Sequence, residues 1–142
     1  MGGNNMVNFT GVWFFDPEKS ELQSPPPETS IFNITYCEQA FSLDRTHIVG
    51  GLPDRFTIEL KLNGTEADIN LRGVNITAKM YWEQDTLVCD MLLKQGKEEA
   101  VNIVKYSLLD EGETLVADEF FESCEYKHHN KWVFNKKAHE PV

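Results

Sequence analysis

Apolar and polar residues alternate along most of the chain, which is the period of a β-strand. The first such stretch covers residues 9–15, places Phe9, Gly11 and Trp13 on one face and ends at Pro17. Glycine lacks a side chain, so another backbone can approach Gly11 closely. Trp13 is too large to remain in water, and its indole N–H needs a partner once buried. We expect this strand to belong to a closed sheet in which Trp13 fills one end.

Nine more stretches show the same alternation, and most are separated by turns of two to four residues. Short turns force neighbouring strands to be antiparallel. The dipeptide Asn63-Gly64 predicts a type I′ hairpin between the fourth and fifth strands, and residues 50–54 are expected to break the sheet. The predicted strands cover residues 9–15, 30–39, 40–49, 56–62, 67–72, 74–82, 86–93, 100–109, 113–125 and 131–136.

Ten consecutive antiparallel strands with one apolar face would expose two edges in an open sheet, and closure removes them. We therefore predict an all-β fold, an up-and-down antiparallel β-barrel of about ten strands, with a two-sheet sandwich as the alternative. The 142 residues fit one domain with tails at 1–7 and 138–142. The Pro-rich residues 17–30 predict a linker that crosses one end of the barrel, with at most one helical turn over 17–22.

Several short motifs support this fold. The chain has Phe-x-Gly-x-Trp at residues 9–13, Asp-Pro-Glu-Lys-Ser at 16–20, similar hairpin sequences at 85–88 and 113–116, and Trp-Val-Phe at 132–134. Together they resemble the lipocalins and fatty-acid-binding proteins, the calycin barrels, and most of all the bacterial lipocalin-like domains of unassigned ligand. The resemblance implies a barrel that holds a small molecule.

The same resemblance carries two expectations about individual side chains. In calycins a basic residue after the last strand packs across the tryptophan that matches Trp13, which implies that Lys136 or Lys137 does so here. Fatty-acid-binding proteins hold the lipid carboxylate with an inward Arg-x-Tyr pair on the last strand. The matching positions here are Trp132 and Phe134, which cannot bind a carboxylate, so the resemblance does not extend to a fatty-acid ligand.

The composition of the chain narrows the range of expected binding partners. The chain carries 23 acidic and 13 basic side chains and a formal charge of −10, which repels nucleic acid and anionic lipid surfaces. No apolar run approaches the roughly 20 residues of a membrane span, and residues 1–7 show no signal peptide. Cys37, Cys89 and Cys124 are widely spaced, as expected for unpaired thiols in a reducing compartment. We expect a cytoplasmic protein and leave its oligomeric state open.

Catalytic and metal-binding motifs are scarce. The sequence lacks a P-loop, a Gly-x-Ser-x-Gly elbow and a His-Glu-x-x-His helix. His128 and His129 are expected in a solvated polar turn, and His47 near a strand end is not favoured as a haem ligand. Neither a metal nor a cofactor is expected. Glu119 is different, because the alternation of its strand points it into an apolar interior, where a carboxylate needs partners. Arg45 or Arg72 could neutralise it.

These observations favour the binding of a small, mostly apolar molecule inside the barrel, without catalysis. One alternative is an enzyme that uses the same cavity with Glu119 as acid or base. Another is a filled barrel that has no ligand and acts through its surface. The expected ligand-binding residues point inward from different strands: Phe56, Ile58, Met80, Trp82, Met91, Tyr106, Glu119, Phe121 and Trp132.

Overall fold

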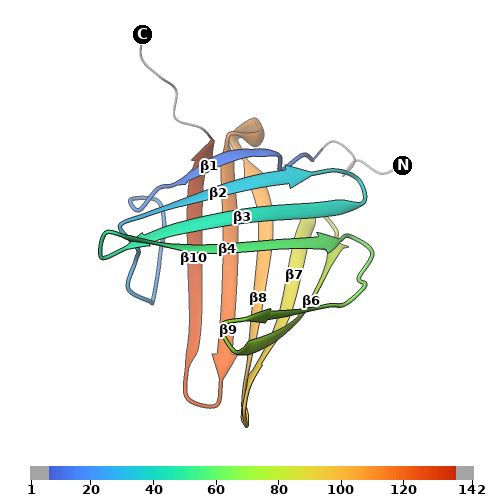
Figure 1. The fold of residues 1–142 in the computed structure, drawn as a ribbon. Helices are drawn as coiled ribbons and strands as arrows, with labels where there is room; N and C mark the ends of the chain where they lie inside the picture. The colour runs from blue at the N-terminus through green and yellow to red at the C-terminus, as the bar shows by residue number, and fades with distance from the viewer. Residues whose placement is uncertain (1–6, 137–142) are drawn as a thin grey trace.

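A computed structural model describes residues 7–136, so the expected tail at 138–142 and most of the one at 1–7 lie outside the described residues. The chain forms a single antiparallel sheet of ten strands, curled into a nearly closed barrel (Figure 1). The strands are β1 (Gly11–Phe15), β2 (Thr29–Tyr36), β3 (Ala40–Val49), β4 (Leu52–Lys61), β5 (Ala67–Leu71), β6 (Val74–Glu83), β7 (Thr86–Gln95), β8 (Glu98–Leu109), β9 (Thr114–Ser123) and β10 (Lys127–Lys136).

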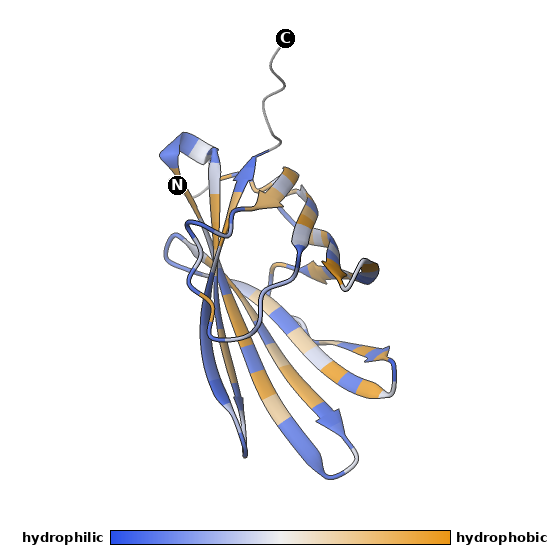
Figure 2. Ribbon diagram, turned by 90° about the vertical axis from the view of Figure 1, so that its left-hand side faces the viewer, coloured by the Kyte–Doolittle hydropathy of each residue, from blue (hydrophilic) through white to orange (hydrophobic). Residues whose placement is uncertain are grey.

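The sheet order is β4-β3-β2-β1-β10-β9-β8-β7-β6-β5, so β1 pairs with β10 and the two ends of the sheet are β4 and β5. The all-β, up-and-down barrel is confirmed, and the two-sheet sandwich is excluded by the continuous pairing. Strands β1–β4 run crosswise to the long strands β7–β10, whose lower ends project beyond the barrel (Figure 1). Hydrophobic and hydrophilic residues alternate along the strands (Figure 2), which places one face of each toward the core. Among residues 7–136, no helix has the length and apolar character of a membrane span.

Three sequence expectations about turns are wrong. Gly50 and Gly51 both have positive φ and form the β3–β4 turn, so β4 begins at Leu52 and residues 52–54 continue the sheet. Pro53 is tolerated there because β4 is an edge strand, where a missing backbone donor costs little. Asn63-Gly64 does not form a hairpin, because β4 and β5 do not pair and the N–H of Gly64 instead donates to the carbonyl of Met80, 2.9 Å away.

The third error concerns the expected polar turn at residues 127–130. These residues form the first part of β10 and pair with β9, and His128 faces Phe121 across the ladder. The turn is shorter than expected because the Ser123 hydroxyl oxygen accepts hydrogen bonds from the backbone N–H groups of Glu125 and Tyr126. The two histidines therefore project from opposite faces of a strand.

The linker between β1 and β2 extends the sheet rather than crossing the barrel end. Residues 17–19 form a turn capped by the Asp16 carboxylate, and no helical turn follows. Glu21 then pairs with Lys131 on β10 through reciprocal backbone hydrogen bonds of 2.9 and 2.8 Å. Because β1 pairs with β10 only at residues 134–136, the linker takes over the next part of the strand.

Trp13 fills the end of the barrel as expected. Its side chain is fully buried, and its indole N–H donates to the carbonyl of Phe9 at 3.0 Å. The Lys136 ammonium lies 5.5 Å from the centre of the Trp13 rings, which confirms the basic residue implied by the calycin resemblance. Lys137 lies outside the described residues. The close neighbour of Gly11 is the Lys136 side chain, since a Cβ at Gly11 would lie 3.1 Å from its Cε.

Replacing Trp13 by alanine should lower the free energy of unfolding by about 3 to 5 kcal/mol, because it leaves a large cavity in the core. The measurement is urea denaturation followed by circular dichroism. Tyr126→Ala is the control, since this aromatic side chain is 60% exposed and its loss should change stability by about 0.5 kcal/mol or less. Equal midpoints for the two variants would contradict the structural role of Trp13.

Candidate ligand-binding site

Strand β3 carries two polar side chains on its inner face. Its alternation buries Phe41 and Leu43 and continues with Arg45 and His47. The Arg45 guanidinium lies 5.3 Å from the centre of the Phe56 ring, a cation–π contact. Burial lowers the pKa of Arg45, and the nearby carboxylates of Asp54 and Glu119 partly oppose this shift. The barrel thus holds a cation in a largely apolar setting.

His47 joins the two crossed parts of the barrel. Its Nδ1 is 2.8 Å from the hydroxyl of Ser30, which is buried, and its ring stacks on Trp132 of β10 with centroids 5.5 Å apart. Burial, together with the positive charge of Arg45, lowers the pKa of His47 to about 4. The ring is therefore neutral near pH 7. Within residues 7–136, no group of three or more His, Cys, Asp or Glu side chains could hold a metal ion.

Glu119 lies on the inner face of β9 and accepts three hydrogen bonds from side-chain N–H groups. Asn102 of β8 donates to Oε2 at 3.0 Å, while Asn130 and Trp132 of β10 donate to Oε1 at 3.1 and 2.9 Å. The inward orientation follows from the alternation, as expected. The partners are amide and indole groups from both neighbouring strands, and these donors match an ionised carboxylate, which can only accept.

Arg72 does not neutralise Glu119. It lies in the turn between β5 and β6 and binds Asp54 at the start of β4, with 2.6 Å between Nη2 and Oδ1. Asp54 also lies 3.7 Å from Arg45. The hydrogen bond from Arg72 and the positive charge of Arg45 lower the pKa of Asp54 below its usual range, despite partial burial. Of the two arginines considered from the sequence, only Arg45 shares the interior with Glu119.

Arg45, His47 and Glu119 line a cavity of about 80 Å³ inside the barrel. Five of the residues expected from the sequence lie around it, namely Phe56, Met91, Tyr106, Glu119 and Trp132. Three others do not: Ile58 and Met80 are buried in the core, and Trp82 packs near Phe9 and Tyr36 at the other end. His47 and Asn102 also line the cavity. The sequence analysis did not include them among the ligand-binding residues, although each continues the inward alternation of its strand.

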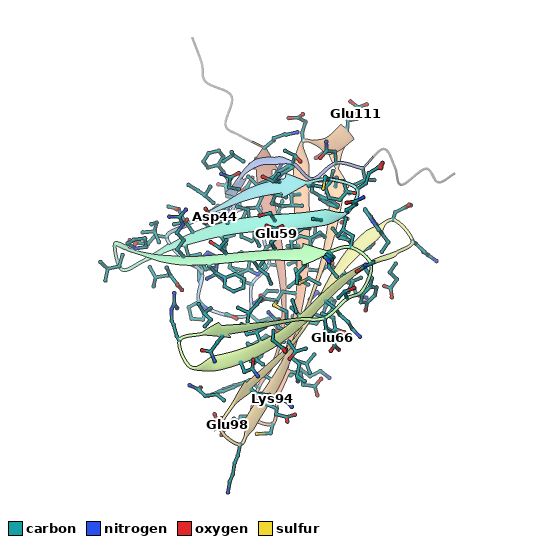
Figure 3. All side chains as sticks on the ribbon, turned by 45° about the vertical axis from the view of Figure 1, so that its right-hand side comes forward. Asp44, Glu59, Glu66, Lys94, Glu98 and Glu111 are labelled. Atoms are coloured by element: carbon teal, nitrogen blue, oxygen red, sulfur yellow. The ribbon has the colours of Figure 1, made fainter. Side chains whose placement is uncertain are left out.

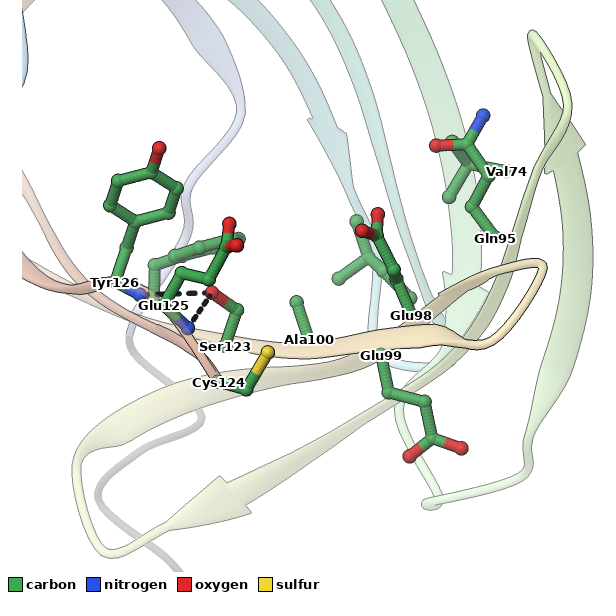
Figure 4. A pocket seen from close by; sticks show the side chains of 11 residues that line it. Val74, Gln95, Glu98, Glu99, Ala100, Ser123, Cys124, Glu125 and Tyr126 are labelled. Atoms are coloured by element: carbon green, nitrogen blue, oxygen red, sulfur yellow. Dashed lines mark hydrogen bonds between the residues drawn. The ribbon is translucent and has the colours of Figure 1, made fainter.

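Two further hollows lie next to this cavity along the inner face of the sheet. One, of about 240 Å³, is bounded by Ser24, Glu119, Phe121, His128 and Asn130, so it shares Glu119 with the cavity. The next, of about 260 Å³, shares Phe121 and lies over the projecting ends of the long strands (Figure 4). Phe121, the ninth expected residue, thus connects the two outer hollows and does not line the cavity itself.

The third hollow is apolar at its floor and acidic at its edge. Its floor includes Val74, Leu93 and Ala100. Glu98 and Glu125 lie at its rim (Figure 4), and neither forms an ion pair with another residue in the range 7–136. Glu98 stands at the tip of the β7–β8 hairpin, near Lys94 (Figure 3).

Comparison with solved structures places this barrel among known folds. Secretory abundant heat soluble protein 4 from Ramazzottius varieornatus is similar over 97% of this chain and 99% of its own, with a TM-score of 0.64 and 14% identity. The zebrafish ileal bile acid-binding protein, complexed with cholic acid, is similar over 91% of this chain and 98% of its own, with a TM-score of 0.63 and 14% identity. Human cRBP IV is similar over 92% of this chain and 99% of its own, with the same TM-score and identity.

The chain shares with these proteins the fold of an up-and-down antiparallel β-barrel. In sequence, no protein-family model matches the chain and no curated protein matches it. Identities of 14% support the common fold and nothing finer. The chemistry of the site must therefore be argued from its own residues.

The low pKa of His47 predicts an acid-sensitive fold. Its pKa is about 4 in the folded protein against an ordinary value of 6.5. Between these values the unfolded chain takes up a proton that the folded chain refuses, so stability should fall as pH decreases through this window. Urea midpoints at about pH 7 and pH 5 measure the effect. Carboxylates with lowered pKa values lose their charge only below this pH range, so they contribute little to the difference between the two midpoints.

The variant His47→Gln keeps a hydrogen-bonding side chain beside Ser30 but cannot take up a proton. It should lose much of the change in urea midpoint between the two pH values. His128→Gln is the matched control, since among residues 7–136 the side chain of His128 contacts the rings of Phe121 and Tyr126 and makes no hydrogen bond or ion pair, and its replacement should leave the pH dependence intact. Identical pH dependence in the native protein and His47→Gln would contradict the burial of a neutral imidazole.

Proposed function

We propose that the protein binds a small, mostly apolar molecule inside the barrel and does not transform it. The observation that supports this most directly is the row of three inner hollows, each of which shares a lining residue with the next. The row begins at the polar cluster around Glu119 and ends over the apolar residues near the sheet end. A pocket with apolar walls and a few polar groups at one end is typical of sites that hold small molecules.

The size of the hollows fits a slender ligand. Drug-sized ligands usually occupy pockets of about 300 to 1,000 Å³, and the cavity beside Glu119 measures only about 80 Å³. It suits the end of a molecule whose body lies along Phe121 in the wider hollows. The zebrafish bile acid-binding protein, a barrel of the same fold, holds cholic acid, an apolar skeleton with polar groups.

The hydrogen bonds of Glu119 argue against the enzymatic alternative. A general base must present a free lone pair to the proton that it removes. Of the about four lone-pair sites of the Glu119 carboxylate, three already accept N–H donors: two on Oε1, from Asn130 and Trp132, and one on Oε2, from Asn102. A single site on Oε2 is left. A carboxylate held in this way is suited to orient neighbouring side chains and is poorly placed to transfer a proton.

The surface alternative has its own candidate on the outer face of β8, β9 and β10. A groove of about 360 Å³ there includes Val101, Ile103 and Phe120, and the Phe120 ring stacks on His129 with centroids 4.4 Å apart. Phe120 is 39% exposed. This groove could also take up an apolar probe, so the experiment must distinguish the two faces of the sheet.

The test is titration with N-phenyl-1-naphthylamine, an uncharged apolar fluorophore. Binding inside the barrel should raise its emission and quench Trp132. Met91→Trp should weaken binding by about tenfold or more, because Met91 lines the cavity and a larger side chain fills it. Phe120→Ala is the control on the outer face and should bind the probe as the native protein does.

Two outcomes would contradict the proposal. If the probe does not bind the folded protein, the interior is closed to apolar molecules. If Phe120→Ala loses the probe while Met91→Trp keeps it, the outer groove is the site. Circular dichroism establishes that each variant is folded before either result is interpreted.

A further inference from the structure

Two buried polar atoms on residues that line the cavity lack a hydrogen-bond partner among residues 7–136. They are the Nε of Arg45, which donates, and the Oδ1 of Asn102, which accepts. Both residues line the 80 Å³ cavity. Buried polar atoms without partners are rare, because each has lost its hydrogen bonds to water without a replacement. A donor and an acceptor on two residues that line the same small cavity therefore indicate a group that can both accept and donate.

The orientation of the Asn102 amide is fixed by its neighbour. A carboxylate only accepts hydrogen bonds, so the end of the amide that contacts Glu119 must be the NH₂ group, which donates at 3.0 Å. The oxygen end is consequently left as the unpartnered acceptor. A hydroxyl group has one donor and two acceptor sites, so it can accept from Arg45 and donate to Asn102 at once. A carboxylate could accept from Arg45 but would repel the Asn102 oxygen.

The charges around the cavity are already balanced. Arg45 and Arg72 are positive, Asp54 and Glu119 are negative, and His47 is neutral near pH 7. An ionised ligand head would add an uncompensated charge beside Glu119 in a partly buried site, where like charges cost several kcal/mol. Glu98 and Glu125 at the rim of the outer hollow disfavour an anion along that path as well.

We infer that the ligand is an uncharged alcohol with an apolar body, whose hydroxyl group lies between Arg45 and Asn102. This inference rests on the proposed function and specifies the ligand class for the same site. The body of the molecule extends past Glu119 and Phe121 toward the apolar floor of the outer hollow. The site thereby discriminates against the corresponding acid.

The experiment compares 1-dodecanol with dodecanoate, which share an apolar chain and differ in the head group. Each displaces N-phenyl-1-naphthylamine from the folded protein at neutral pH, below its aggregation limit. The alcohol should bind more tightly than the acid by about tenfold or more. Equal or tighter binding of the acid would overturn the inference and leave the proposed function standing. Failure of both molecules and of the probe to bind would instead refute the proposed function.

Glu119→Gln tests which residues select the head group. The amide oxygen of glutamine can still accept from Asn130 and Trp132, while its NH₂ group requires an acceptor from Asn102. The Asn102 amide must then turn and present its NH₂ group to the ligand, and one negative charge is lost. The preference for the alcohol should shrink or reverse, through tighter binding of dodecanoate.

Glu122→Gln is the matched control, because Glu122 lies on the same strand, is exposed and carries the same charge. It should leave the preference unchanged. Equal shifts in the two variants would indicate a general effect of net charge and would overturn the assignment of the head group to this cavity. If Glu119→Gln does not fold, the alcohol and acid comparison on the native protein still decides the inference.

Discussion

A carboxylate on the inner face of a barrel must be compensated, and the three N–H donors around Glu119 meet this requirement. The donors come from β8 and β10, so the charge ties three neighbouring strands together. Asn130 extends the network to the linker, since its Oδ1 accepts the backbone N–H of Gln23 at 2.7 Å. The linker is thereby held along β10, and the inner face below it stays open.

The second part of the polar interior reaches the two free edges of the sheet. Arg45 contacts Asp54 on β4, and Asp54 binds Arg72 in the turn between β5 and β6. Strands β4 and β5 do not pair, so this ion pair bridges the gap at one end, and the hydrogen bond from Gly64 to Met80 bridges it at the other. The charges that balance the cavity therefore also help to close the barrel.

Much of this structure could be predicted from the alternation of residues, because burial of one face of each strand imposes it. Phe9, Trp13, Ile58 and Met80 are buried on the face that the alternation predicts. The strand pairing at Asn63-Gly64 could not be predicted, since the same dipeptide serves a hairpin and a turn that leaves the sheet. The start of β10 was missed because His128 and His129 have little strand propensity, and cross-strand pairing with β9 overrides it.

The apolar part of the site and Glu119 were predicted from the sequence, whereas His47 and Asn102 were missed, for a physical reason. Apolar residues at inward positions identify a core. Ile58 and Met80 show that this pattern does not distinguish residues that pack in the core from residues that line the cavity. His47 and Asn102 also occupy inward positions, yet each is acceptable only because a partner on another strand binds it. Such partners depend on how the sheet curls, which no short stretch of sequence specifies.

The central claim is that a ligand occupies the cavity that Glu119 and Trp132 help to line. The most direct measurement is a two-dimensional ¹H–¹⁵N spectrum of the folded protein during titration with 1-dodecanol. The indole N–H of Trp132 donates to Glu119 and should shift, whereas that of Trp13 donates to Phe9, and neither of these two residues lines the cavity, so its signal should not shift. An unchanged Trp132 signal, with shifts confined to backbone amides of the outer groove at Val101 and Phe120, would contradict the account.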